Sequence, residues 1–186
     1  MRWIQKHSSP PDFEQWKVDF EAAYGRHPIY NDLKGKPKRD LKSALIAEQG
    51  HICCYCMARV SVDSSHIEHY VPRAETRRDP HSILATDNQL GYENMFVSCE
   101  GEKIGETWDG RHCGKAKKDE GTAMLVSPTD PAVASYFSYD TEGNIQGLTP
   151  EAMTTVRVLN LQDIALIRHR RKAIFLSRRG QEDPGL

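Results

Sequence analysis

Residues 51–73 read HICCYCMARVSVDSSHIEHYVPR, a stretch that sets a pair of cysteines close to two histidines and a glutamate. Two residues separate Cys53 from Cys56, a spacing that lets both sulfur atoms bind one ion about 2.3 Å away. Tetrahedral zinc needs two further ligands, and Cys99 and Cys113 are the candidates. The sequence therefore predicts a structural Zn²⁺ site built from Cys53, Cys56, Cys99 and Cys113.

Three alternative roles for these cysteines compete with metal binding. A redox C-x-x-C pair is expected at a helix start after a strand in a βαβ pattern, which this sequence does not show. Disulfides fit poorly with a reducing compartment, and buried cysteines without a ligand are common. The remaining cysteine, Cys54, is expected to be a small buried or half-exposed side chain and not a fifth ligand. Because residues 51–131 contain few large apolar side chains, metal–thiolate bonds would have to replace part of a hydrophobic core.

The composition describes a globular protein of ordinary size. The chain has 186 residues, 25 basic and 26 acidic, with a net charge of −1. No apolar run reaches the roughly 18 residues of a membrane span, and MRWIQKHSSPPDFEQW lacks a secretory apolar core, so we expect a cytoplasmic protein without membrane contact. The near-equal numbers of basic and acidic residues exclude a uniformly basic nucleic-acid binder. Basic residues nevertheless gather at Lys34–Lys42, Lys115–Lys118 and Arg168–Arg179.

The first segment, residues 1–50, is predicted to be helical. Aromatic residues recur at helical spacing before Gly25, which is a natural helix end: Phe13, Trp16, Phe20 and Tyr24. A second helix is expected from Leu41 to Glu48 and ends at Gly50. The stretch Lys34–Lys42 between them is interpreted either as a solvated linker or as a strip that contacts phosphates.

Residues 51–131 form the second predicted segment and residues 132–186 the third. In the second, Ala58–Val62 and His66–Val71 are expected to pair as a hairpin. In the third, SYFSYD and TEGN predict a short hairpin ending near Ile145. Thr149 and Pro150 then start a helix. A last helix is expected to restart at Asn160, with Asp163 three residues later.

His66, Glu68 and His69 suggest hydrolytic chemistry. A carboxylate can hold Mg²⁺, and a neighbouring neutral imidazole can take a proton from water. Glu68 and His69 are adjacent and therefore on opposite sides of an extended chain. His66 shares a strand face with Glu68 and is either a support for the metal or an exposed side chain. Hydrolysis of a phosphodiester needs a metal and a base close together.

Four segments carry a resemblance to a known family: CCYC at 53–56, IEHYVPR at 67–73, ENMFVSC at 93–99 and HCGKAKK at 112–118. Their order resembles that of HNH endonucleases, in which C-x-x-C precedes a D/E-H-x-x-P strand, N-x-x-x-x-C, and a second cysteine followed by lysine. The chain is most similar to the PtuB-like HNH proteins of Septu and retron-associated anti-phage defence, over about residues 41–174. The resemblance implies an α+β fold, a zinc-stapled ββα-metal core with N- and C-terminal helical additions.

The resemblance also implies residue roles. His69 matches the general base, Glu68 the ligand of a catalytic Mg²⁺ or Mn²⁺, and Asn94 the residue that orients the base. The position after the last cysteine is usually His or Asn and helps to hold that metal, but here it is Gly114, which has no side chain. His112 and Asp119 are the candidate replacements, and the alternative is a metal held by Glu68, water and substrate phosphates. Three lysines that follow the metal site are expected to contact substrate phosphates: Lys115, Lys117 and Lys118.

The function expected from these residues and the resemblance is a metal-dependent endonuclease that hydrolyses phosphodiester bonds of nucleic acid, with DNA favoured over RNA as the substrate. The resemblance implies that it is the effector subunit of a bacterial anti-phage defence complex. The alternatives are a zinc-stabilised nucleic-acid-binding module without catalysis and a pure interaction subunit. The resemblance further implies an ABC-type ATPase (PtuA-like) as partner and, in some systems, a retron reverse transcriptase with its RNA.

Overall fold

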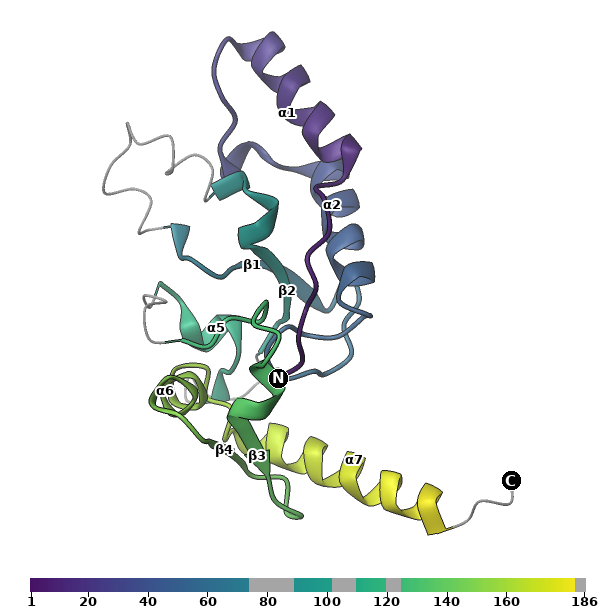
Figure 1. Ribbon diagram of the computed structural model, residues 1–186. Coiled ribbons are helices and arrows are strands. Elements are labelled where there is room, and N and C mark those ends of the chain that lie inside the picture. Colours follow the sequence, from purple (N-terminus) through teal and green to yellow (C-terminus); the bar gives the residue numbers. More distant parts are fainter. Residues whose placement is uncertain (74–88, 102–109, 120–124, 183–186) are drawn as a thin grey trace.

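A computed structural model describes residues 1–73, 89–101, 110–119 and 125–182, apart from the side chains after Ser177. Two helices lie at one end of the molecule, a two-stranded sheet lies in the middle, and a hairpin with two more helices lies at the other end (Figure 1). This mixture of helices and small sheets is the α+β composition expected from the sequence. Among the described residues, no helix is long and apolar enough to cross a membrane.

The N-terminal end consists of α1 (Pro11–Tyr24), the 3-10 turn η1 (Tyr30–Asp32) and α2 (Gly35–Glu48). Gly25 ends α1 with a φ of 65°, as the sequence predicts, because glycine adopts this left-handed conformation without a steric cost. The interpretation of Lys34–Lys42 as a linker is wrong. The helix begins at Gly35, so most of these basic residues occupy its first turns.

The central sheet pairs β1 (Ser65–His69) with β2 (Met95–Cys99), antiparallel, with Ser65 opposite Cys99 and His69 opposite Met95. The predicted hairpin between Ala58–Val62 and His66–Val71 is wrong. Residues 58–62 instead close the turn that carries the first two cysteines, since Cys53 N donates a 2.8 Å hydrogen bond to Ala58 O. The partner of β1 comes from much later in the chain.

Helix α2 packs against β2 and fixes its position. Leu41 and Leu45 are buried in the same core as Phe96 and Val97. The Gln49 side chain completes the contact: Val97 N donates to Gln49 Oε1 at 2.7 Å, and Gln49 Nε2 donates to Val97 O at 2.9 Å. The backbone of β2 is therefore hydrogen-bonded both to β1 and to the end of α2.

The hairpin of β3 (Phe137–Tyr139) and β4 (Ile145–Gly147) follows the short 3-10 turn η4 (Val133–Tyr136) and agrees with the prediction. Helix α6 (Pro150–Val158) begins as expected, because the Thr149 side chain accepts a 3.2 Å hydrogen bond from Ala152 N.

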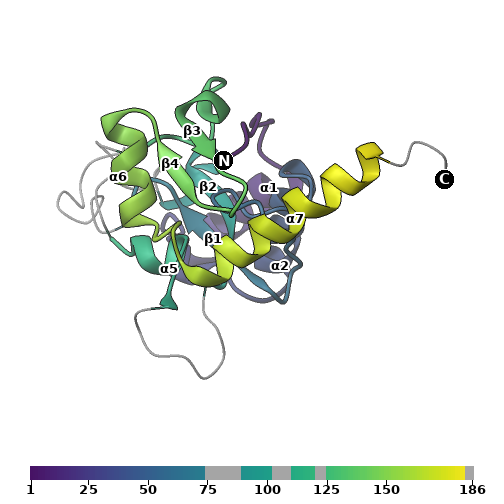
Figure 2. The same ribbon diagram turned by 90° about the horizontal axis from the view of Figure 1, so that it is seen from below.

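Helix α7 (Ile164–Glu182) begins later than predicted. Asp163 caps its N-terminus, since the Asp163 carboxylate accepts a 2.9 Å hydrogen bond from Ala165 N. Asn160 lies in the preceding turn with a φ of 46°. The helix projects away from the rest of the molecule (Figures 1 and 2).

Backbone hydrogen bonds cross the boundaries between the three predicted segments. One of them joins Cys113 N in the second segment to Leu159 O in the third. The division into three segments stays a prediction.

Candidate metal centre and adjoining histidine site

Four cysteine side chains converge at one end of the β1–β2 pair. Their sulfur atoms all lie within 4.8 Å of one another, and they belong to Cys53, Cys56, Cys99 and Cys113. Cys56 Sγ and Cys99 Sγ are 3.8 Å apart. A tetrahedral ion with metal–sulfur bonds of about 2.3 Å holds its ligands about 3.8 Å apart. The thiols can therefore hold one metal ion, and zinc suits this ligand set.

The backbone positions each of these cysteines. A tight turn presents Cys53 and Cys56, with Met57 N donating to Cys53 O at 3.1 Å and Met57 at a φ of 64°. Cys99 is the last residue of β2, and Cys113 directly precedes α5 (Gly114–Lys117). The sequence pattern thus identified the four residues that the fold brings together. Cys54 is buried and outside the cluster, as expected.

The surroundings shift the pKa values of the thiols in opposite directions. Burial raises the pKa of Cys113 well above its ordinary value, whereas a hydrogen bond from Cys113 lowers the pKa of Cys99 to about 6. Both groups need to be thiolates to bind a metal, and a bound cation supplies the charge that makes this possible.

His112 belongs to the cysteine cluster. Its Nδ1 lies 3.2 Å from Cys113 Sγ and 3.8 Å from Cys99 Sγ. Burial lowers its pKa, but the Cys99 sulfur outweighs this effect and raises it overall. The side chain is therefore directed at the thiols. The sequence instead suggested His112 as a ligand of the catalytic metal in place of residue 114. The other candidate, Asp119, is exposed beyond the end of α5.

A second polar cluster surrounds the Glu68 carboxylate on β1. Glu68 Oε1 accepts hydrogen bonds from Lys117 Nζ at 3.0 Å and from Tyr55 Oη at 3.1 Å. Lys117 Nζ also donates to His69 O at 2.9 Å. Burial alone raises the pKa of Glu68, but His66 and Lys117 outweigh burial and hold it below its ordinary value. Glu68 is therefore a buried, charged carboxylate.

Lys117 does not lie where the sequence led us to expect it. Its side chain is 1% exposed, so its ammonium neutralises Glu68 and does not face a substrate from solvent. The sequence offered no signal for this, because a lysine in a basic run ordinarily faces water. Lys115 pairs with Glu100 at 3.1 Å, and Lys118 is exposed. Tyr55 and Glu100 are site residues that sequence reasoning missed.

The Oε2 atom of Glu68 points toward His66 and Gly114. His66 Nε2 lies 3.6 Å from Glu68 Oε2, and both atoms face the start of α5. A Cβ atom placed on Gly114 would lie 2.6 Å from Glu68 Oε2 and 2.7 Å from His66 Nε2. The absence of a side chain at Gly114 is therefore what allows His66 and Glu68 to approach each other here.

His69 lies on the other side of β1, where its ring meets Tyr30 edge-on with centroids 4.6 Å apart. His69 Nε2 is 3.0 Å from Gln89 O. A carbonyl oxygen only accepts hydrogen bonds, so Nε2 carries the proton and Nδ1 holds the free lone pair. Burial lowers the pKa of His69 to about 4, with a further contribution from Arg73. The imidazole is neutral at pH 7 and can accept a proton at Nδ1.

Asn94 fixes the chain just after His69. Val71 N donates to Asn94 Oδ1 at 2.7 Å, and Asn94 Nδ2 donates to Val71 O at 3.0 Å. The backbone adds a bond from Tyr70 N to Asn94 O at 3.0 Å. Asn94 ends the short turn η2 (Tyr92–Asn94) that leads into β2, so its side chain joins the two strands where β1 ends.

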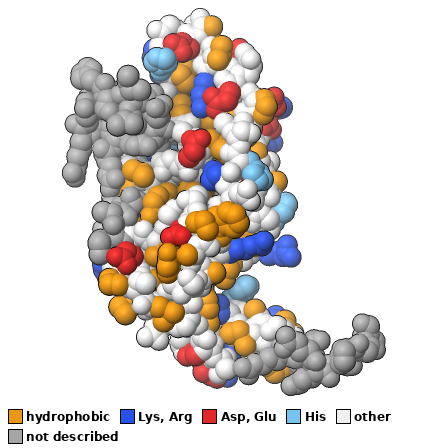
Figure 3. Space-filling view, viewed as in Figure 1, with side chains coloured by type: hydrophobic (Ala, Val, Ile, Leu, Met, Phe, Trp, Pro, Cys, Tyr) orange, Lys and Arg blue, Asp and Glu red, His pale blue; other side chains and the backbone are white. Residues whose placement is uncertain are grey.

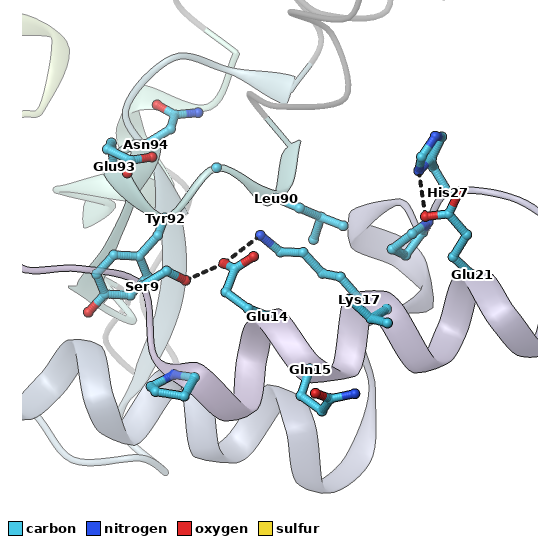
Figure 4. Close-up of a pocket in the computed structure, with 14 residues that line it drawn as sticks. Ser9, Glu14, Gln15, Lys17, Glu21, His27, Leu90, Tyr92, Glu93 and Asn94 are labelled. Carbon is cyan, nitrogen blue, oxygen red and sulfur yellow. Dashed lines mark hydrogen bonds and ion pairs between the residues drawn. The ribbon is translucent and has the colours of Figure 1, made fainter.

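A groove of about 790 Å³ lies between α1 and residues 90–94. Its charged side chains are mostly acidic: Glu14, Glu21 and Glu93, with Lys17 paired to Glu14 at 2.8 Å (Figure 4). Neither Glu68 nor His69 lines it. Acidic and basic side chains are also interspersed over this end of the molecule in Figure 3. An acidic lining disfavours a phosphate backbone, so this groove is a poor candidate for the path of a nucleic acid.

These features define a small α+β protein with a cluster of four thiols that can hold a metal, next to a strand that carries a buried glutamate and a neutral histidine. No protein-family model matches the chain. A search of curated proteins finds one described as the candidate HNH endonuclease of retron Vc95 from Vibrio cholerae serotype O1 biovar El Tor. It is 31% identical over 179 residues, which cover 92% of this chain and 81% of that protein. The chain belongs to the HNH endonuclease family.

Proposed function

We propose that this protein is a metal-dependent HNH endonuclease that hydrolyses phosphodiester bonds, with DNA as the preferred substrate. In this proposal β1, β2 and α5 form the ββα-metal core. Zn²⁺ occupies the four-thiol site, and Mg²⁺ or Mn²⁺ binds at Glu68. The family assignment supports a nuclease, and the environment of His69 is the observation that carries the proposed chemistry.

His69 acts as the general base. Its Nδ1 takes a proton from the attacking water, and Gln89 O, 3.0 Å from Nε2, stabilises the positive charge that then forms on the ring. Burial keeps the ring neutral beforehand, so the lone pair is available at neutral pH. Asn94 positions this base through its two hydrogen bonds to the Val71 backbone.

Glu68 supplies the anionic ligand next to the base in sequence. A divalent cation held there stabilises the negative charge that develops on the phosphate. Lys117 and Tyr55 hold the carboxylate by its Oε1 atom, which leaves Oε2 directed toward α5. A buried carboxylate that is oriented in this way binds without having to reorganise.

The proposal is tested by incubating the protein with supercoiled plasmid and with tRNA, each with Mg²⁺ and with Mn²⁺. The wild type should nick the plasmid. His69→Ala should reduce nicking at least about 100-fold, the usual contribution of a general base. His27→Ala removes an exposed imidazole on α1's side of the molecule and is the matched control. Undiminished cleavage by folded His69→Ala would exclude His69 as the base.

A non-catalytic interaction subunit is the second candidate, and helix α7 favours it. Phe175 and Leu176 are 55% and 56% exposed near the end of this projecting helix. Large apolar side chains at such a site often contact a partner. This candidate predicts no cleavage with any metal.

The proposed partners are an ABC-type ATPase (PtuA-like) and, in a retron, a reverse transcriptase with its RNA. The retron origin of the similar protein supports a defence-system context. Control by a larger complex would restrain a nuclease that otherwise attacks its host. Co-expression followed by size-exclusion chromatography tests the ATPase: a shared peak supports the proposal, and separate elution contradicts it.

A further inference from the structure

Gly114 occupies the position where the resemblance leads us to expect a side chain that binds the catalytic metal. In this chain the space for that side chain is already filled, since a Cβ on Gly114 would lie 2.7 Å from His66 Nε2. Gly114 is not among the residues with positive φ, so its backbone does not require glycine. The lack of a side chain therefore allows both His66 and Glu68 to approach this point, and it does not serve the conformation of the turn.

The spacing of His66 and Glu68 suits two ligands of one ion. Their facing atoms, Nε2 and Oε2, are 3.6 Å apart. Two ligands about 2.1 Å from a metal are about 3 Å apart at a right angle and about 3.6 Å apart at 120°. The two residues alternate along β1 onto the same face, so the strand itself provides this pairing. The other oxygen of Glu68 is occupied by Lys117 and Tyr55.

The second nitrogen of His66 is also arranged as in a metal-binding histidine. Nδ1 is buried and has no hydrogen-bond partner among the described residues, while Glu100 Oε1 lies 3.8 Å away. A histidine that binds a metal through one nitrogen usually donates its other N–H to a carboxylate, which fixes the ring and its tautomer. Glu100 is in place for this with a small movement, and Lys115 holds its Oε2 at 3.1 Å.

We propose that His66 Nε2 binds the catalytic cation together with Glu68 Oε2, in place of a side chain at residue 114, and that Glu100 is its positioning residue. This inference rests on the proposed function. His66 suits this role better than His112, whose Nδ1 is directed at the thiols, 3.2 Å from Cys113 Sγ. The mixed nitrogen and oxygen ligands favour Mn²⁺ over Mg²⁺, which prefers oxygen and loses its water reluctantly.

Mn²⁺ titration followed by electron paramagnetic resonance tests the assignment in zinc-loaded protein. Thiolate sites prefer zinc to Mn²⁺, so the probe reports the second site. We expect one bound Mn²⁺ with hyperfine coupling to an imidazole nitrogen. His66→Ala should abolish the coupling and weaken binding by about 10- to 100-fold or more, while Glu100→Gln should weaken binding by about 10-fold and keep the coupling.

His69→Ala and His27→Ala should retain both the affinity and the coupling, because neither ring faces Glu68 Oε2. Coupling that persists in His66→Ala, or that disappears in His69→Ala, would overturn the assignment. Failure of the wild type to bind Mn²⁺ would also overturn it. The zinc content of each variant shows whether the thiol site and the fold are intact.

A swap between the two positions sharpens the test. Gly114→Asn alone should lose the nitrogen coupling, because its side chain displaces the His66 ring. The double variant His66→Ala with Gly114→Asn leaves a Cβ 2.6 Å from Glu68 Oε2, but removal of the His66 ring gives this carboxylate oxygen space to move away. Affinity should then recover to within about 10-fold of the wild type without nitrogen coupling, since an amide oxygen binds the ion. A double variant that binds no better than His66→Ala contradicts the equivalence of the two positions.

The plasmid assay separates this inference from the proposed function. If Mn²⁺ binds with nitrogen coupling that depends on His66 but no variant cleaves nucleic acid, the metal site stands and the nuclease proposal fails. If the wild type cleaves nucleic acid and His66→Ala cleaves equally well, the nuclease proposal stands and the role of His66 fails.

Discussion

The two polar clusters on the central sheet differ in how their charges are satisfied. At one end of the strand pair, four like ligands surround a single point, with Cys56 and Cys99 sulfurs 3.8 Å apart. Toward the other end, the Glu68 carboxylate is shared between unlike neighbours, a buried lysine on one oxygen and a histidine near the other. A site closed by four protein ligands can only hold structure, whereas a site with fewer ligands leaves room for substrate. Under the proposed function, the thiol cluster would hold the fold together and the Glu68 cluster would take part in the chemistry.

The largest effect should come from the thiol cluster. Cys113→Ser should abolish zinc binding and unfold the central sheet at 25 °C, because metal binding of this kind contributes about 10 kcal/mol or more. Metal analysis and far-ultraviolet circular dichroism measure both outcomes. Cys54→Ser alters a buried cysteine outside the cluster and is expected to retain zinc. Full zinc content in Cys113→Ser would remove the distinction between the two clusters.

The second effect tests the charge balance at Glu68. Lys117→Met should destabilise the zinc-loaded protein by about 3 kcal/mol, because it leaves a buried carboxylate without its ammonium partner. Millimolar Mn²⁺ should reverse part of this loss by supplying positive charge at the same carboxylate. Urea unfolding with and without Mn²⁺ provides the measurement. Lys115→Met changes a half-exposed lysine, and we expect a loss below about 0.5 kcal/mol. Equal losses in the two variants would show that burial of the pair has no special importance.

A smaller loss of stability is expected when Asn94 is replaced. Asn94→Ala removes two hydrogen bonds to Val71 and should lower the free energy of unfolding by about 2 kcal/mol. Because this linkage follows His69 closely, cleavage should also slow by more than the change in folded fraction explains. The exposed Asn31, which accepts a 3.3 Å hydrogen bond from Arg73, is the control position. Asn94→Ala with wild-type activity and stability would argue against a positioning role.

The smallest expected change is in the pH dependence of cleavage. Burial lowers the pKa of His69 to about 4, so protonation of the base is displaced to lower pH. Lowering the pH from 8 to 5.5 should therefore change the ionisation of this base by less than about twofold. A histidine with an ordinary pKa of about 6.5 would lose about tenfold. Initial cleavage rates, with zinc content checked at each pH, distinguish the two cases, and a tenfold fall would contradict the buried environment of His69.

Much of the thiol site follows from the sequence, because ligand spacing and residue type are local properties. The C-x-x-C pair predicted the turn whose cysteines join the four-thiol cluster, and Thr149 and Gly25 marked helix ends correctly. The pairing of β1 was wrong because the alternation in residues 58–62 resembles that of a strand while their backbone serves the cysteine turn. Pairing across more than twenty residues leaves no local signal.

The surroundings of Glu68 were the least predictable part of the site. A lysine in a basic run gives no indication that it will be buried against a carboxylate 49 positions earlier in the chain. Gly114 appeared in the sequence only as the lack of an expected ligand. The reason for a glycine at this position appears only in the folded structure. There β1 and α5 lie together, and His66 occupies the space that a side chain at 114 would fill.

The distribution of the four thiols along the chain also has a kinetic consequence. Cys53 and Cys56 are close in sequence, whereas Cys99 and Cys113 must be brought from far along the chain to complete the set. Because closing a longer loop costs more entropy, an ion should bind the first pair early and recruit the distant cysteines afterwards. Refolding should then be limited by the long-range pairing of β1 with β2, as expected for contacts of high sequence separation. An ion bound by the four thiols would thus determine the order in which the segments of the core assemble, as well as hold the finished core together.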